Sequence, residues 1–289
     1  CLAGLGPCEI YNRANFGSRR GDLPVVALKF FTTMNTLKRI DKEDYTLVQL
    51  NRGKVNAINA EMVKELREVF REMEDDPAIK GVILTGQPHY FSAGLDLIEL
   101  FQYDKKQISD FFEAFGALYL QLVRFPKPFI SAITGHAPAG GCVLAVTSDN
   151  RFMAEGDKYV IGLNEVAVNV QISQNLTEAY AFWMGDGRAS RYILEGKLLS
   201  GPEALTAGLV DELVPLEHVV ERAEKQMHTY LKADPEIWAR TKQKVRKHWL
   251  DRLDPDGKQS LQEAATLWWK PEIRKKMEAY VLSFTSKAR

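Results

Sequence analysis

The chain has 289 residues, with 38 basic and 38 acidic side chains, and 45% of it is apolar. This length predicts about one or two domains with a substantial core. The zero formal charge argues against a nucleic acid or a membrane surface as the default partner, because such partners select an excess of Lys and Arg. The apolar fraction excludes disorder, and no apolar run approaches the roughly 18 to 20 residues that cross a bilayer, so we expect a soluble globular protein.

Residues 1–33 differ in character from the rest of the chain. A loop-like stretch of mixed charge is followed by a short apolar run at 25–31 and then by Met34. A signal peptide requires a basic start directly before its apolar stretch, and the order here is different. We expect Met34 to open the domain and residues 1–33 to form a poorly ordered extension; a transit peptide is opposed by Glu9 and Asp22, and a lipidated Cys1 is a further alternative.

The three cysteines limit which covalent and metal sites the chain can form and indicate its redox compartment. Cys1, Cys8 and Cys142 are too few and too scattered for a disulfide framework or a tetrahedral zinc site. We therefore expect no metal and a reducing compartment, which is the cytoplasm or, in a eukaryote, the mitochondrial matrix.

Short strand-like runs alternate with amphipathic helical patterns from residue 45 onward. Strands are predicted at 45–50, 79–85, 129–134, 150–154 and 158–161, and helices at 60–74, with Asn59 as N-cap, and at 108–123. After about residue 178 the pattern is helical, at 179–184, 189–194, 202–207, 219–231, 235–250 and 261–283. Strands separated by helices predict an α/β fold. We expect an α/β core at 34–200 and a helical C-terminal region at 201–289.

The helical region carries a basic run at 240–247 and several aromatic residues. A run of this kind is typical of a solvated helix face, which is the interpretation we favour. Trp249, Trp268 and Trp269 indicate that these helices pack on the core or on a neighbouring subunit.

Two loops rich in small residues follow predicted strands. Residues 91–96 read Phe-Ser-Ala-Gly-Leu-Asp, and residues 136–142 read His-Ala-Pro-Ala-Gly-Gly-Cys before an apolar helical segment. Glycines that open a helix leave N–H groups free for an oxygen that carries negative charge. Taken alone, the first loop is more typical of a tight turn with Asp96 as a helix cap. Together the loops predict two donors that converge on one oxygen, the arrangement of an oxyanion hole.

Five motifs in order carry a resemblance to a known family. They lie at 50–59 (LNRGKVNAIN), 91–96, 135–149, 162–165 (GLNE) and 194–215. On them the chain resembles the crotonase, or enoyl-CoA hydratase/isomerase, superfamily from about Tyr45 to the C-terminus. The resemblance implies a crotonase-like spiral of ββα units with a helical C-terminal region, assembled as a homotrimer or a dimer of trimers.

The resemblance also implies the ligand and the groups that hold it. An acyl-CoA thioester would lie with its carbonyl oxygen between the backbone N–H groups of Leu95 and Gly140. Ala93 and the loop of Lys54, Val55 and Asn56 would contact the CoA part, although an exposed Lys54 without a role is equally expected. Coenzyme A enters as part of the substrate, so no separate cofactor is expected.

The number of carboxylates decides the expected reaction. Family hydratases have two glutamates, and the positions that match them here hold Val143 and Glu165. Hydration needs one group to activate water and another to protonate carbon, whereas one base suffices to shift a double bond. The motifs around Glu165 and Val143 are similar to those of mitochondrial-type Δ3,Δ2-enoyl-CoA isomerases. We therefore expect an isomerase with Glu165 as the proton shuttle.

Several alternatives remain beside this hypothesis. They are a weak hydratase, a decarboxylase or an acyl-CoA hydrolase with one carboxylate, and a non-catalytic binding protein of the same fold. The segment 168–174 (VNVQISQ) departs from the family's Gly-Ile-x-Pro-like turn and is compatible with an unusual acyl group or with weakened activity. Among other candidates, Cys142 is expected to be packing, Asp96 a cap and Glu99 a solvated helix residue. His136 is equally expected to contact the ligand or to be a loop residue without a role.

Overall fold

The structure is a computed structural model that describes residues 34–254 and 258–285. The extension predicted at 1–33 lies outside the described residues. The division into a core at 34–200 and a helical region at 201–289 stays a prediction. Within the described residues the strands are β1 (Leu37–Asp41), β2 (Tyr45–Leu50), β3 (Gly81–Thr85), β4 (His89–Tyr90), β5 (Phe129–Ile133), β6 (Gly135–Pro138), β7 (Asn150–Ala154), β8 (Val160–Gly162), β9 (Leu199–Ser200) and β10 (Glu212–Val214).

The helices of the same residues are α1 (Ala60–Asp75), α2 (Leu97–Leu100), α3 (Lys105–Arg124), α4 (Gly140–Ala145), α5 (Gln174–Met184), α6 (Asp186–Glu195), α7 (Gly201–Ala207), α8 (Val219–Tyr230), α9 (Pro235–Arg252), α10 (Lys258–Trp268) and α11 (Pro271–Thr285). Two short 3₁₀ helices are η1 (Glu165–Val168) and η2 (Leu216–His218). None of these helices is long and apolar enough to span a lipid bilayer.

The strands of the described residues form two sheets. The larger has the order β1-β2-β3-β5-β7-β10, parallel except for the antiparallel β1-β2 pair, and the smaller has the order β4-β6-β8-β9. The chain visits the large sheet, then the small sheet, then a helix, as β3-β4-α2, β5-β6-α4 and β7-β8 before η1 and α5. This repetition is the predicted spiral of ββα units, and the predicted α/β fold is confirmed.

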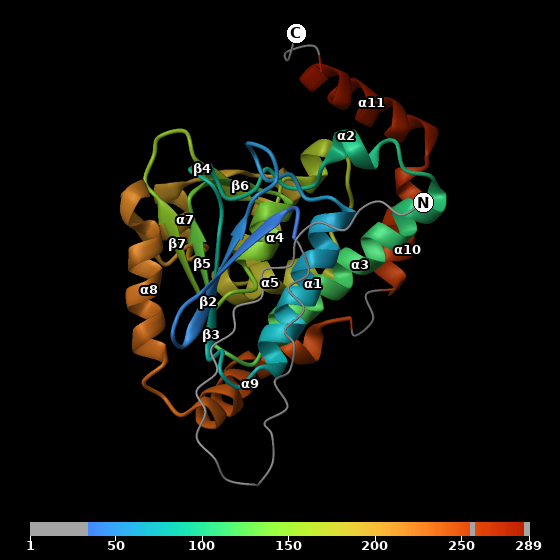
Figure 1. Ribbon diagram of the computed structural model, residues 1–289. Coiled ribbons are helices and arrows are strands. Elements are labelled where there is room, and N and C mark those ends of the chain that lie inside the picture. Colours follow the sequence, from blue (N-terminus) through green and yellow to red (C-terminus); the bar gives the residue numbers. More distant parts are fainter. Residues whose placement is uncertain (1–33, 255–257, 286–289) are drawn as a thin grey trace, which may run out of the picture. The chain divides into compact units, whose positions relative to one another are not determined.

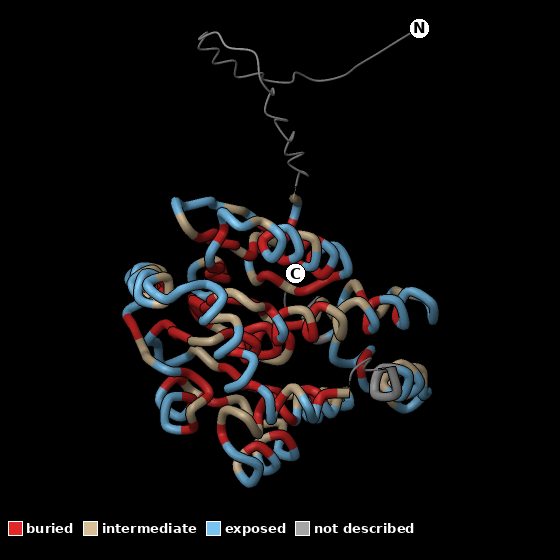
Figure 2. The backbone as a smooth tube through the Cα atoms, turned by 90° about the horizontal axis from the view of Figure 1, so that it is seen from below, coloured by how far each residue is buried: buried red, intermediate tan, exposed pale blue. Residues whose placement is uncertain are grey.

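Helices cover both faces of the large sheet (Figure 1). On one face Ile83, Ile130 and Phe152 pack against Val219 and Met227 of α8. The opposite face belongs to the larger core with α1, α3 and α4. Side chains of adjacent strand residues point to opposite faces, so strands that are buried on both faces, such as β3 and β5, are mostly apolar. In Figure 2 the buried residues (red) concentrate in the interior, away from the exposed helical surfaces.

Two expectations about the C-terminal half were wrong in part. The predicted helix 261–283 is two helices, because Pro271 lacks the N–H that would continue α10 and instead begins α11. The strands β9 and β10 lie in a stretch predicted to be helical, and β10 pairs in parallel with β7. Both strands have only 2 or 3 residues, too short to show alternation.

The basic run at 240–247 is not simply a solvated face. Lys242 and Arg246 of α9 are buried and form ion pairs of 2.8 Å with the two carboxylate oxygens of Asp149. Arg246 also donates to the carbonyl oxygens of Val123 and Thr147 at 3.0 Å. This cluster anchors α9 to the segment between α4 and β7. Arg240 and Lys247 on the same helix are exposed, as the sequence predicts.

Candidate active site

Two backbone loops meet at Gly94 and Gly140. A Cβ atom on Gly94, which has φ +86°, would lie 3.0 Å from the carbonyl oxygen of Pro138 and 3.2 Å from the nitrogen of Gly140. A Cβ on Gly140 would lie 3.3 Å from the Cα of Gly94. The two loops predicted to converge therefore do touch, and glycine at both positions is what permits the contact.

Within the described residues, the amide groups of Leu95 and Gly140 have no hydrogen-bond acceptor. Ile58 donates its N–H to the carbonyl of Gly94 at 2.8 Å and accepts from the N–H of Asp96 at 2.9 Å, so the N–H of Leu95, between them, faces away from Ile58. Across residues 34–254 and 258–285, neither the N–H of Leu95 nor that of Gly140 donates to another protein group. Two unpaired donors thus come from loops in contact.

Ala139 holds the second loop in a strained conformation. Its φ is +46° and its ψ is −118°, a combination that costs an alanine about 1 to 3 kcal/mol. Its N–H donates to the carbonyl of Gly162 at 2.7 Å. This bond ties the end of β6, directly before Gly140, to the end of β8, shortly before Glu165.

Glu165 begins η1 and is 8% exposed. Burial raises the pKa of its carboxyl group to about 7, against the opposing effect of a hydrogen bond with its own backbone N–H. Its Oε2 is buried and has no hydrogen-bond partner within the described residues. A buried carboxyl with a free oxygen and a pKa near neutrality is suited to exchange protons.

Glu165 lines a cavity. Its lining within the described residues holds one carboxylate, that of Glu165, and is otherwise mostly apolar; it consists of Leu95, Phe112, Phe115, Gly116, Tyr119, Val143, Glu165, Val170, Gln171, Ser173, Asn175, Leu176 and Ala264. Val143 thus lines the same cavity as Glu165. The divergent segment at 168–174 contributes Val170, Gln171 and Ser173 to one wall, so it does shape the site.

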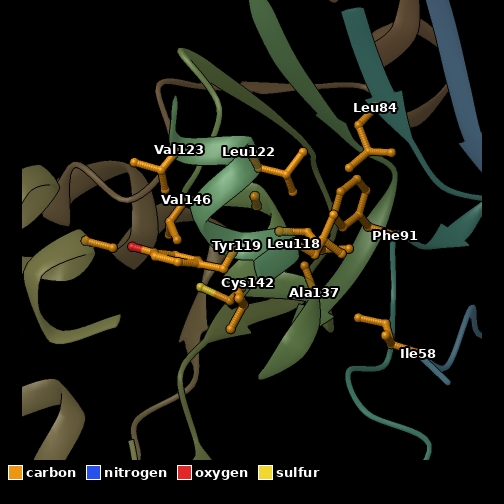
Figure 3. Close-up of a cluster of buried hydrophobic side chains, with 14 of the residues drawn as sticks. Ile58, Leu84, Phe91, Leu118, Tyr119, Leu122, Val123, Ala137, Cys142 and Val146 are labelled. Atoms are coloured by element: carbon orange, nitrogen blue, oxygen red, sulfur yellow. The ribbon is translucent and has the colours of Figure 1, made fainter. Parts of the chain in front are cut away.

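Tyr180 of α5 connects the parts of this site. Its hydroxyl accepts a hydrogen bond from the N–H of Leu163 at 2.7 Å and lies 3.4 Å from the Sγ of Cys142. Burial raises the pKa of Cys142 to about 12, so this thiol is a packing group and not a nucleophile. Figure 3 shows Cys142 within the buried cluster beside Ala137 and Tyr119.

The loop expected to contact coenzyme A is tied to the loop of Leu95. The carbonyl of Val55 accepts from the N–H of Ala93 at 2.8 Å. Asn56 is buried, with φ +51°, and its amide donates to the carbonyls of Tyr90 and Phe91. Asn56 thus has a structural role in the loop, while Lys54 is exposed.

Arg52 was not singled out from the sequence, yet it joins the same two loops. Its guanidinium donates to Asp96 and Glu99 at 2.7 Å each. Asp96 also accepts from the N–H of Glu99 and caps α2 as predicted. The side chain of Glu99 is 34% exposed, and its carboxylate also accepts from the hydroxyl of Tyr103 at 2.6 Å, so the predicted solvated residue is also part of this network.

His136 lies in β6, and its carbonyl accepts from the N–H of Phe91 at 3.0 Å. Its ring packs against the rings of Tyr90 and Tyr159, with centroids 5.1 and 5.3 Å away. Burial, and next the nearby His89, lower its pKa. The predicted loop residue is therefore a half-buried packing residue of a strand.

Four residues on one face of α3 line the cavity and were also missed. Phe112, Phe115, Gly116 and Tyr119 follow the spacing i, i+3, i+4, i+7 of a single helix face. The spacing was visible in the sequence, but an apolar helix face predicts a packed core equally well. Ala264 of α10 lines the same cavity, and it carried no local signal because it lies far from α3 along the chain.

The sequence and the fold match those of known proteins. The family model described as enoyl-CoA hydratase/isomerase matches residues 42–284. The chain is 32% identical over 268 residues to the mitochondrial enoyl-CoA delta isomerase 1 of Rattus norvegicus, covering 92% of this chain and 93% of the relative. It is 31% identical over 191 residues to the mitochondrial enoyl-CoA hydratase of Pongo abelii, covering 64% of this chain and 63% of the relative.

A solved structure shows the same fold. The crystal structure of human mitochondrial delta3-delta2-enoyl-CoA isomerase has a TM-score of 0.83 at 28% identity, covering 88% of this chain and 99% of the human chain. The resemblance carried by the five sequence motifs is confirmed. The chain belongs to the enoyl-CoA hydratase/isomerase family, that is, to the crotonase superfamily.

Proposed function

We propose that the protein is a Δ3,Δ2-enoyl-CoA isomerase, which converts a 3-enoyl-CoA into the conjugated 2-enoyl-CoA. The observation that carries the proposal is the cavity with one carboxylate among its described lining residues, Glu165, and with Val143 at the position of a second. The isomerases among the relatives, from rat and human, support the same choice.

Glu165 would act as the base and then as the acid. Its carboxylate removes a proton from C2 of the 3-enoyl thioester, and the electron pair of the C–H bond moves into a dienolate with its negative charge on the thioester oxygen. The protonated Glu165 then returns the proton to C4, which leaves the double bond between C2 and C3. A positioned base of this kind contributes about 10² to 10⁴ in rate.

The N–H groups of Leu95 and Gly140 would stabilise the dienolate oxygen. Both lack a protein acceptor within the described residues, so a ligand oxygen would meet donors that are already free and oriented. The loss of one such donor typically costs about 3 to 4 kcal/mol of barrier. The contact between Gly94 and Gly140 supports this assignment, because it brings the two loops together.

The pKa of about 7 at Glu165 suits a group that must both take and return a proton. A carboxyl with an ordinary pKa is a weak base, whereas one near neutrality is matched to the operating pH. Isomerisation needs the carboxylate form at the start, so we expect activity to rise with pH through about 7.

Hydration is the second candidate, and the hydratase relative from Pongo abelii is the observation that favours it. Hydration needs one group to deprotonate the attacking water and a second group to protonate carbon. The side chain of Val143 can do neither. Decarboxylation, thioester hydrolysis and binding without turnover remain further outcomes that product analysis distinguishes.

The test is to incubate the protein with a 3-enoyl-CoA and to follow formation of the conjugated 2-enoyl product by absorbance and chromatography. Glu165→Gln is expected to lower the rate by at least about 10². Glu195→Gln, at an exposed position of α6, is the matched control and should keep the rate. Absence of conversion, or full conversion by Glu165→Gln, would refute the proposal; a 3-hydroxyacyl product would favour hydration.

We extend the proposal to the ligand and the assembly. Lys54 would meet a phosphate of coenzyme A, which enters as part of the substrate, and the chain would form a trimer or a pair of trimers. Ile237 and Val245 of α9, which are 62% and 66% exposed, are apolar positions available for a subunit contact. The relatives from rat and mouse are named as mitochondrial proteins, which supports the mitochondrial matrix as the compartment. Analytical ultracentrifugation tests the proposed trimer, and microscopy of the tagged chain in cells tests the proposed compartment.

A further inference from the structure

Gly116 is a glycine within the 20-residue helix α3. A glycine inside a helix makes the helix less stable than an alanine would, because it has more backbone freedom to lose. Its neighbours on the same helix face, Phe112, Phe115 and Tyr119, also line the cavity of Glu165. Among three large aromatic side chains, Gly116 is therefore the position of this face that lines the cavity with backbone alone.

The aromatic side chains around Gly116 are held from behind. Phe115 stacks on Phe111 with ring centroids 6.0 Å apart, and Phe112 meets Trp268 of α10 edge-on at 5.7 Å. The hydroxyl of Tyr119 donates to the carbonyl of Asn175 at 2.8 Å. These contacts hold the three rings beside Gly116, so each ring has a partner other than the cavity.

The rest of the cavity favours a hydrocarbon over a polar group. Val143, Leu176 and Ala264 face the same space as α3. The amide of Asn175 is already bonded to the backbone of Asp254, and that of Gln171 to Glu263. A polar substituent on a ligand would lose its hydration against walls that are mostly apolar.

We propose that Gly116 is a specificity-determining residue, which gives a long unbranched acyl chain its path between α3 and segment 170–176. The inference rests on the proposed function, in that the ligand is an acyl-CoA whose reactive end lies at Glu165. A side chain at position 116 would shorten the path without touching Glu165, Leu95 or Gly140. Short acyl chains would still fit, and long ones would not.

The test compares Gly116→Ala and Gly116→Val with the unchanged protein, using binding of the saturated ligands butyryl-CoA and decanoyl-CoA measured by calorimetry. Gly116→Val should lower the affinity for decanoyl-CoA by at least about tenfold and the affinity for butyryl-CoA by less than about twofold. Gly116→Ala should raise the unfolding midpoint, since helix propensity improves while the new methyl group enters the cavity. Gly187→Ala, at an exposed helical position with nothing near its added Cβ, is the control and should leave both affinities unchanged.

The outcomes separate this inference from the proposed function. Equal losses for the two ligands, no loss for decanoyl-CoA, or a lowered unfolding midpoint in Gly116→Ala would overturn the role of Gly116. Because the ligands are saturated, their binding does not depend on isomerisation. A chain that shows the length effect without turning over a 3-enoyl-CoA would retain the inference and lose the proposed function.

Discussion

The substitution Glu165→Gln should stabilise the folded protein at high pH while it abolishes proton transfer. Burial raises the pKa of Glu165 from 4.5 to about 7, so folding the ionised form is unfavourable. One pKa unit corresponds to about 1.4 kcal/mol, which gives a cost of about 3 kcal/mol at pH values well above the raised pKa. Glutamine has nearly the shape of the neutral acid and carries no charge to desolvate.

The sign follows from proton linkage. Between pH 4.5 and about 7 the folded state binds more protons at Glu165 than the unfolded state, so the free energy of unfolding falls as pH rises. Below this window both states are protonated and the difference between the variant and the unchanged protein should be small. Above it, the difference should level off at about 3 kcal/mol in favour of Glu165→Gln.

Urea unfolding at a series of pH values from about 5 to about 8.5 measures this difference directly. Other titrating groups are common to both proteins and cancel in the difference curve. Glu113→Gln, at an exposed position of α3, controls for the removal of one negative charge. A difference curve that is flat across this range, or that favours the unchanged protein at high pH, would contradict the burial argument for Glu165.

Three further substitutions test the contacts that support the site. Arg52→Ala removes the ion pairs with Asp96 and Glu99, and we expect about a tenfold loss of kcat/KM, with partial recovery in Arg52→Lys. Asp149→Asn leaves the buried Lys242 and Arg246 without their carboxylate, which should lower the free energy of unfolding by about 3 kcal/mol or more in urea. Tyr180→Phe leaves the N–H of Leu163 without its acceptor, which should cost about 1 to 3 kcal/mol of stability and lower kcat.

Each of these predictions has a result that contradicts it. Unchanged kinetics in Arg52→Ala would show that the loops hold their positions without the ion pairs. An unfolding midpoint of Asp149→Asn equal to that of the unchanged protein would mean that the two cations find other partners. For Tyr180→Phe, full stability together with full activity would remove Tyr180 from the support of the site.

Features that local chemistry determines could be predicted from the sequence. The strand at 45–50 and the helix capped by Asn59 follow from periodicity and capping. The convergence of the loops at Gly94 and Gly140 followed from small residues after strands that lie side by side. These signals are contained within a few residues, so they survive without knowledge of the fold.

The remaining features depend on contacts between distant segments. Asp149 and Arg246 are 97 residues apart, and nothing local distinguishes Arg246 from its exposed neighbours on α9. Arg52 and Glu99, 47 residues apart, pose the same difficulty. The break at Pro271 could have been predicted from the sequence, since proline cannot continue a helix. The prediction of one helix at 261–283 did not take this proline into account.

The distribution of the cavity lining along the chain has a consequence for folding. Leu95, Glu165 and Ala264 face one space but lie on segments far apart in the chain, so the cavity is complete only when all of these segments are in place. Contacts between such distant segments form late, because the chain must close long loops before they become favourable. Recovery of ligand binding after dilution from denaturant should therefore lag behind recovery of secondary structure, and it would report completion of the native state.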